Sequence, residues 1–164
     1  MTSNDVLRRV RYIFDFNDNK MIAIFASAES KVTREQISCW LKKDDDPDYQ
    51  KLSDTQLAIF LNGLINDKRG KKDGPKSEPE KRLTNNIIFM KLKIALNLKA
   101  EDTLEIMHMA NFPMSKHELS AFFRKPDHKH YRSCKDQIFR NFLNGLQIKY
   151  RNDGKTPSDS VWKK

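Results

Sequence analysis

The chain has 164 residues and carries 31 Lys and Arg against 22 Asp and Glu, so its formal charge is +9. No stretch approaches the roughly 18–20 apolar residues of a membrane-spanning helix, and the N-terminal sequence MTSNDVLRRV lacks the apolar segment of a secretory signal. Cys39 and Cys134 each stand alone, which excludes paired disulfide frameworks and CxxC metal spacings. We therefore expect a reduced, cytoplasmic protein of one or two small domains.

The positive charge is concentrated in the second half of the chain. Residues 1–69 hold 11 Lys and Arg and 11 Asp and Glu, so this half is neutral. Residues 86–151 hold 12 against 6 and contain all four histidines, so their net charge is +6. A basic half beside a neutral half indicates a polyanionic partner for the basic half only.

Four helices are predicted in the first half, over 4–15, 18–29, 33–43 and 53–69. In each of them apolar residues recur at helical spacing, for example Val6, Val10 and Ile13. Alternation with a period of two, which is typical of a half-buried strand, is absent. Adding 82 to each range gives the four helices predicted for the second half.

Capping boxes mark three of these helix starts, with Thr33, Ser53 and Ser115 followed three residues later by Gln or Glu. Each box is flanked by a pair of apolar residues that predicts a hydrophobic staple: Val32 and Ile37, Leu52 and Leu57, Met114 and Leu119. In the second half, the residue that aligns with Ser53 is Lys135. We expect the cap of that helix to be lost or to shift to Ser133.

The sequence FLNGL occurs at 60–64 and again at 142–146, an offset of 82 residues. At this offset 14 positions between 4 and 69 are identical without any gap, which predicts a tandem duplication. The segment GKKDGPKSEPEKRLT between the copies has the composition of a linker. The predicted organisation is a neutral repeat over 1–69, a polar linker over 70–84, a basic repeat over 85–151 and a flexible tail over 152–164.

The fold class predicted is all-α, with two tandem homologous four-helix repeats packed together. A unit of about 65 residues is marginal alone, so the two repeats are expected to share apolar surface. Gly63 and Gly145 lie inside predicted helices, where Gly costs ~1 kcal/mol relative to Ala. They indicate a close approach of another group, either within each repeat or between the two fourth helices around a pseudo-twofold axis.

With the repeat aligned, the sequence resembles the YehS-like family of bacterial proteins. The resemblance covers about residues 4–151 and rests on four stretches: NDVLRRVRYIFD, WLKKDDDPDY with LSDTQLAIFLNGLI, HELSAFFRKPDHKHYRSCKD and FLNGLQ. It implies a bacterial, cytoplasmic protein made of two copies of one small domain. It implies no catalytic residue and no cofactor, because the family is itself uncharacterised.

A helix over 18–29, a short turn and a capped helix over 33–43 form a helix-turn-helix-like layout. In such motifs polar residues at the start of the second helix contact base edges. The candidate groove-reading residues are Arg34 and Gln36 in the first copy and Lys116 and His117 in the second. The alternative is the ordinary packing of short helices in a small α-domain.

The stretch RKPDHKHYR, residues 124–132, predicts a phosphate-binding or single-strand-binding loop, because cations follow a phosphate backbone and rings stack on bases. Its candidate residues are Arg124, Lys125, His128, Lys129, His130 and Arg132. The aligned stretch KKDDDPDYQ in the first copy is acidic and would repel phosphate. The alternative is a solvated loop that follows a helix end.

No metal, cofactor or catalytic site is expected. His128, His130 and Cys134 lack an evident fourth zinc ligand, and the acidic loop at 44–48 lacks the spacing of a calcium loop. Phosphate-binding glycine motifs, a nucleophile elbow and HExxH are all missing from the sequence.

Two hypotheses for function remain. The first is a non-enzymatic, nucleic-acid-associated protein that uses the basic surface of the second repeat. The second is a protein–protein adaptor or homodimer, without nucleic-acid binding, whose neutral first repeat supplies the interface. Salt distinguishes them, because polyanion binding weakens steeply as salt rises.

Overall fold

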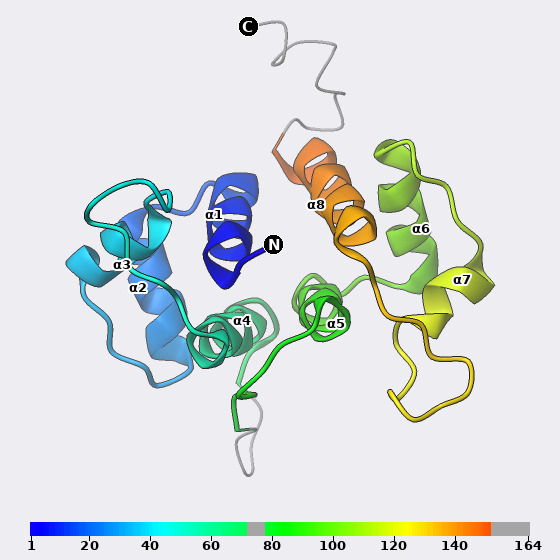
Figure 1. Ribbon diagram of the computed structural model, residues 1–164, viewed down its shortest axis with the longest axis horizontal. Coiled ribbons are helices and arrows are strands. Elements are labelled where there is room, and N and C mark those ends of the chain that lie inside the picture. Colours follow the sequence, from blue (N-terminus) through cyan, green and yellow to red (C-terminus); the bar gives the residue numbers. More distant parts are fainter. Residues whose placement is uncertain (72–77, 152–164) are drawn as a thin grey trace, which may run out of the picture. The chain divides into compact units, whose positions relative to one another are not determined.

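The computed structural model describes residues 1–71 and 78–151, and within them it shows eight α-helices and no strand (Figure 1). The predicted all-α class is therefore confirmed. Residues 72–77 of the predicted linker and the predicted tail, 152–164, lie outside the described residues. None of the described helices has the length and apolar character needed to cross a membrane.

Each predicted helix is present in the structure. The first repeat contains α1 Ser3–Phe14, α2 Asp18–Ser27, α3 Arg34–Leu41 and α4 Asp54–Arg69. The second contains α5 Asn85–Ala95, α6 Ala100–Met109, α7 Lys116–Ala121 and α8 Asp136–Tyr150. The largest difference from prediction is at α7, which ends four residues before the predicted 125.

The early end of α7 has a local cause. The N–H groups of Phe122 and Phe123 donate to Leu119 and Ser120, three residues back, at 3.1 Å each, so the last turn tightens. Pro126 follows closely, and a proline disfavours helical geometry in the residue before it. The counterpart helix α3, which lacks that proline, runs for eight residues against six in α7.

The predicted helix caps form. The Thr33, Ser53 and Ser115 hydroxyls accept from the third residue of their helices, whose side chains bond back to the cap N–H groups. Thr2 and Asp5 form a further capping box at α1, which is not among the predicted ones. Lys135 is the N-cap of α8 and makes no side-chain cap bond, so that cap is lost and not shifted to Ser133.

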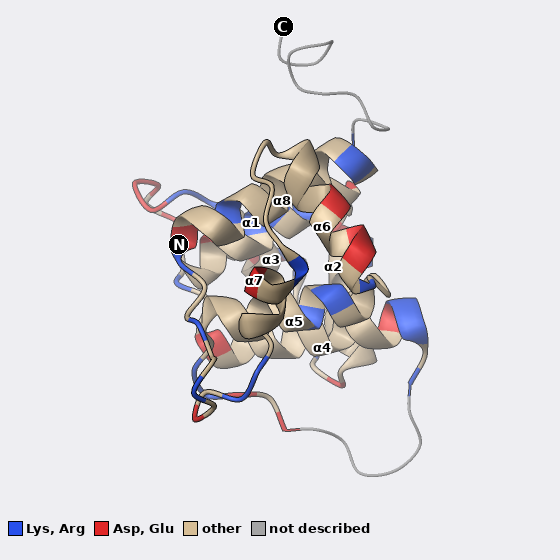
Figure 2. Cartoon of the chain, turned by 90° about the vertical axis from the view of Figure 1, so that its right-hand side faces the viewer, with Lys and Arg blue, Asp and Glu red and all other residues tan. Residues whose placement is uncertain are grey.

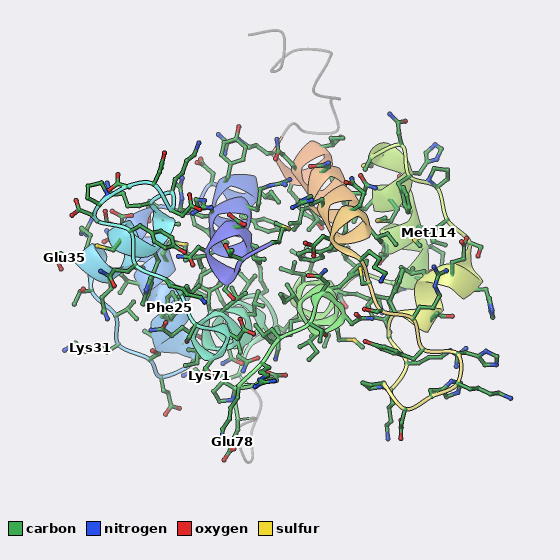
Figure 3. All side chains as sticks on the ribbon, in the orientation of Figure 1. Phe25, Lys31, Glu35, Lys71, Glu78 and Met114 are labelled. Atoms are coloured by element: carbon green, nitrogen blue, oxygen red, sulfur yellow. The ribbon has the colours of Figure 1, made fainter. Side chains whose placement is uncertain are left out.

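The chain divides into two compact units, Met1–Leu83 with Ile94–Asn97, and Thr84–Lys93 with Leu98 onward. In the first repeat, the Phe25 ring (labelled in Figure 3) lies 5.6 Å from Trp40 and 5.2 Å from Phe60, centroid to centroid. Trp40 is 5% exposed and its counterpart Phe122 is 1% exposed, as their places in the apolar stripes predict. That the two repeats pack together stays a prediction.

The core of the second repeat is built around Phe89 of α5. Its ring stacks on Phe142 of α8 with a centroid separation of 4.1 Å and meets Phe123 edge-on at 5.1 Å. Phe89 takes the place of Leu7 in the first repeat, so this ring stacking has no equivalent at that position of the first repeat. Aromatic pairs in these geometries add ~0.5–1.5 kcal/mol beyond the area they bury.

Gly63 and Gly145 lie where their helices cross the second helix of the same repeat. A Cβ atom added at Gly63 would lie 2.9 Å from the Ile24 carbonyl carbon, and one at Gly145 would lie 2.9 Å from that of Ile106. Ile24 and Ile106 are themselves related by the 82-residue offset. The retained glycines are therefore explained by close packing of α4 on α2 and of α8 on α6, the within-repeat alternative.

Candidate polyanion-binding loop

The third and fourth helices of each repeat are joined by a loop, and the two loops are closed at the base in the same way. In the first repeat the Gln50 N–H donates to the Cys39 carbonyl at 3.1 Å. In the second, the Arg132 N–H donates to the Ala121 carbonyl at 3.1 Å. These bonds fix where the chain leaves and re-enters the helical core. We call residues 42–51 the acidic loop and residues 124–133 the basic loop.

A buried asparagine on the first helix holds the base of the acidic loop. The Asn4 Nδ2 group donates to the Trp40 and Gln50 carbonyls at 2.9 Å each. Its Oδ1 atom accepts from the Leu52 N–H at 2.9 Å and from the Tyr49 hydroxyl at 3.0 Å. Asn4 is 1% exposed and uses its full bonding capacity of two donors and two lone pairs.

Asn86 holds the basic loop in the same way. Its Nδ2 group donates to the Phe122 carbonyl at 3.0 Å and the Arg132 carbonyl at 2.8 Å, and its Oδ1 accepts from the Cys134 N–H at 2.9 Å. The Tyr131 hydroxyl does not make the fourth bond. Asn4 and Asn86 are identical at the offset of 82, and this identity is the signal in the sequence from which their shared role could have been predicted.

Within the loops the backbone turns also coincide. The Asp46 N–H donates to the Lys43 carbonyl and the Tyr49 N–H to the Asp46 carbonyl, both at 3.0 Å. At the aligned positions, the His128 N–H donates to the Lys125 carbonyl at 2.9 Å and the Tyr131 N–H to the His128 carbonyl at 3.0 Å. The two loops therefore follow one hydrogen-bonding pattern although their side chains differ.

One turn position uses different chemistry in the two loops. The Asp46 Oδ1 atom accepts from the Asp48 N–H at 2.8 Å, whereas the His128 Nδ1 atom accepts from the His130 N–H at 3.0 Å. An imidazole nitrogen accepts a hydrogen bond only when it carries no proton. The turn of the basic loop therefore uses the Nδ1 lone pair of His128 as its acceptor, where the turn of the acidic loop uses a carboxylate oxygen.

The charges of the two loops are opposite. The acidic loop has three Lys against four Asp, a net charge of −1, and the basic loop has four Lys and Arg against Asp127, a net charge of +3. Figure 2 shows blue Lys and Arg positions along the segment that follows α7. The basic loop thus contains all six predicted polyanion-binding residues.

The predicted residues of the basic loop differ in exposure. Five are exposed, namely Lys125, His128, Lys129, His130 and Arg132. Arg124 is only half-buried, and its Nε has no hydrogen-bond partner among the described residues.

The carboxylate of Glu118 in α7 is influenced by one cation of the basic loop. The Ser115 backbone N–H and hydroxyl lower the pKa of Glu118, and the charge of Arg132 adds to this effect. No described carboxylate forms an ion pair with Lys125 or Lys129, so these ammonium groups are available to a ligand.

The predicted groove-reading residues have local roles. In the first repeat, the Arg34 guanidinium donates to the Asn19 side chain at 2.7 Å and lies 3.5 Å from the Asp18 carboxylate, while Gln36 completes the capping box with Thr33.

Their counterparts lie in the second repeat. Lys116 pairs with Glu101 at 3.5 Å, and His117 is exposed. The helix that carries both, α7, has six residues, fewer than two turns. The structure therefore divides the four residues between two short helices, and their contact with a groove stays a prediction.

Cys134 closes the basic loop but offers little reactivity. It is 3% exposed, and burial, with the Asp136 carboxylate nearby, raises its pKa to about 12. It is therefore a protonated thiol at neutral pH, which is a poor metal ligand and a poor nucleophile. Within residues 1–71 and 78–151, no three His, Cys, Asp or Glu side chains lie close enough together to hold a metal ion.

The helices and loops define an all-α protein built from two tandem copies of one four-helix unit. The chain belongs to the family described as protein of unknown function DUF1456, whose model matches residues 3–70 and 85–152. It is 48% identical over 147 residues to the uncharacterized protein YehS of Escherichia coli (strain K12), covering 89% of this chain and 94% of that protein. The resemblance to the YehS-like family is confirmed. No solved structure matches.

Proposed function

We propose that the protein acts by binding, without catalysis, and that the basic loop of the second repeat binds a nucleic acid or another polyanion. One observation carries the proposal. Both repeats build the same loop with the same backbone bonds, yet the loops have net charges of −1 and +3. Since the fold accepts either charge at this place, the fold does not require the positive charge.

The geometry of the loop favours phosphate binding. Lys125 and Lys129 are exposed and have no carboxylate partner in the described part of the chain, so a ligand would not have to break existing ion pairs. Neutralising phosphates with such cations releases condensed counterions, which drives binding. The bonds of Asn86 and Arg132 fix the base of the loop before any ligand arrives, and this lowers the ordering cost of binding.

The test is a fluorescence-anisotropy titration of the full chain against labelled single-stranded and duplex oligonucleotides at two salt concentrations. The combined variant Arg124→Gln, Lys125→Gln, Lys129→Gln and Arg132→Gln is expected to lose most of the affinity. Its stability is expected to change little, because Lys125, Lys129 and Arg132 are exposed and exposed charges contribute about 0–1 kcal/mol. Arg124→Gln alone measures what the half-buried Arg124 adds to stability. In the wild type, four cations on duplex phosphates predict a slope of roughly −3 to −4 for log K against log salt.

The acidic loop supplies the matched control. Asp44→Lys, Asp45→Lys and Asp46→Lys together should strengthen binding, because they give the first repeat the same charge as the second. If the wild type binds neither the oligonucleotides nor inorganic polyphosphate at low salt, the proposal is wrong. The adaptor or homodimer hypothesis then takes its place, and sedimentation of the same samples tests self-association.

A further inference from the structure

The basic loop presents two aromatic rings beside its cations. The His128 and His130 ring centroids lie 5.5 Å apart, with 41° between their planes, and both residues are exposed. In Figure 3 the side chains of the loop that follows α7 extend away from the helices of the second repeat. The aligned residues of the acidic loop are Asp46 and Asp48, so the ring pair is specific to the second repeat.

We infer that the ligand of this loop is single-stranded nucleic acid, whose bases stack on the His128 and His130 rings while Lys125, Lys129 and Arg132 hold its phosphates. This inference rests on the proposed function and names its ligand class. Histidine is among the side chains on which unstacked bases lie, and stacking tolerates any base because every base has a flat face.

The ring geometry limits how bases can bind. Nucleotides stack about 3.4 Å apart along a strand, so a base between two parallel rings would need them about 7 Å apart. At 5.5 Å and 41°, the two imidazoles do not admit a base between them. They form a tilted platform on which neighbouring bases lie against the outer faces.

The His128 side chain is fixed for this role. Its Nδ1 atom accepts from the His130 N–H at 3.0 Å, which orients the ring. The attraction to the strand then comes from Lys125, Lys129 and Arg132, which alternate with the rings along the loop. A protein loop in which cations and rings alternate can bind the phosphates of a single strand with the cations and stack its bases on the rings.

A duplex fits this surface less well. Its bases are stacked inside the helix, where loop imidazoles cannot reach their faces, and groove reading generally uses an inserted helix or β-ribbon. The helix that precedes the basic loop, α7, has six residues, and its first, Lys116, is already paired with Glu101 at 3.5 Å.

The experiment compares three labelled probes on the full chain at one low salt concentration. They are an oligothymidylate of about twelve nucleotides, within the usual site sizes of single-strand-binding folds, a duplex of the same length, and inorganic polyphosphate of matched charge. Polyphosphate has the phosphates without the bases. The inference predicts that the single strand binds more tightly than the duplex.

Two variants remove one ring each. His128→Asn keeps a side-chain oxygen acceptor for the turn, as Asp46 does in the first repeat, and His130→Ala leaves the backbone N–H that the turn uses. Each should weaken single-strand binding about fivefold or more, the range that stacking of one base contributes, and leave polyphosphate binding unchanged. Lys125→Gln with Lys129→Gln should weaken binding of all three probes. Circular dichroism verifies that each variant is folded.

The outcomes separate the two proposals. If no probe binds, the proposed function is wrong. If the probes bind but the duplex is equal to or tighter than the single strand, or if the ring variants bind the single strand as well as the wild type does, then polyanion binding stands and the single-strand inference is overturned.

Discussion

The acidic and basic loops share one pattern of backbone hydrogen bonds and have net charges of opposite sign. Asn4 and Asn86 bond to three aligned backbone positions at the ends of the loops, and the turns inside the loops coincide. Nothing in this hydrogen-bond network uses the Lys and Asp side chains of the loops except the acceptor at Asp46, which is half-buried. The comparison shows that the buried network determines the shape of the loop and leaves its surface free to vary. Such positions on a rigid scaffold are where binding residues are commonly found.

The loops also differ in how many side chains restrain them. In the first repeat Tyr49 adds a fourth bond to Asn4, and Arg8 donates to the Lys42 carbonyl at 2.8 Å. In the second repeat the position of Arg8 is occupied by Met90, which cannot donate, and Tyr131 does not bond to Asn86. The acidic loop is therefore held by more side-chain bonds than the basic loop.

The largest expected effect tests whether the two cores are equivalent. Trp40→Ala and Phe122→Ala should each lower the free energy of unfolding by ~3–5 kcal/mol, since both remove a buried aromatic ring and leave a cavity. Urea denaturation followed by circular dichroism measures the change, with the exposed Lys31→Ala as a control of near-zero effect. A loss below about 1 kcal/mol in either variant would contradict the equivalence.

The next effect tests the asparagines. Asn4→Ala or Asn86→Ala leaves two backbone carbonyls and one N–H without their partner. Buried polar groups left unbonded cost ~1–3 kcal/mol each, so each variant should lose about 3 kcal/mol. Asn→Asp at either site keeps the shape but cannot donate to the carbonyls, and it should be at least as unstable. If urea denaturation finds the Ala variants as stable as the wild type, the asparagines do not hold the loops.

A smaller effect is expected at the glycines. Gly63→Ala and Gly145→Ala should each destabilise by ~1–3 kcal/mol through overpacking against the Ile24 and Ile106 backbones. This loss would exceed the gain of ~1 kcal/mol that Ala brings to a helix. Thermal unfolding with a calorimeter measures the result. Stabilisation of both variants would show that the second helix of each repeat can move away without cost.

The smallest effect is a difference between the repeats. Tyr49→Phe removes the hydroxyl that donates to Asn4 and should cost about 1 kcal/mol, the usual net contribution of one hydrogen bond. Tyr131→Phe removes a hydroxyl that makes no such bond and should cost nothing measurable. Parallel urea titrations of the two variants make the comparison. Equal losses would mean that Tyr131 also supports its loop.

Much of the fold could be predicted because the signals are local. A capping box such as Thr33 with Gln36 acts over three residues, and the apolar stripes repeat within one helix, so both can be read along the chain. The 82-residue offset then transferred each prediction from one repeat to the other. The residues of the basic loop were predicted for the same reason, because cations and rings next to one another in sequence share a surface wherever the loop lies.

The tertiary structure decided what distant segments do to one another. The partners of Asn4 lie 36 to 48 residues away in sequence. An asparagine that looks like an ordinary polar residue near a helix start is therefore the buried residue that holds the base of the acidic loop. Likewise, a glycine inside a helix indicates a close approach but cannot name the Ile24 carbonyl as the group that approaches. Only the folded chain brings these atoms together, because a hydrogen bond or a steric contact depends on distance in space and not on separation along the sequence.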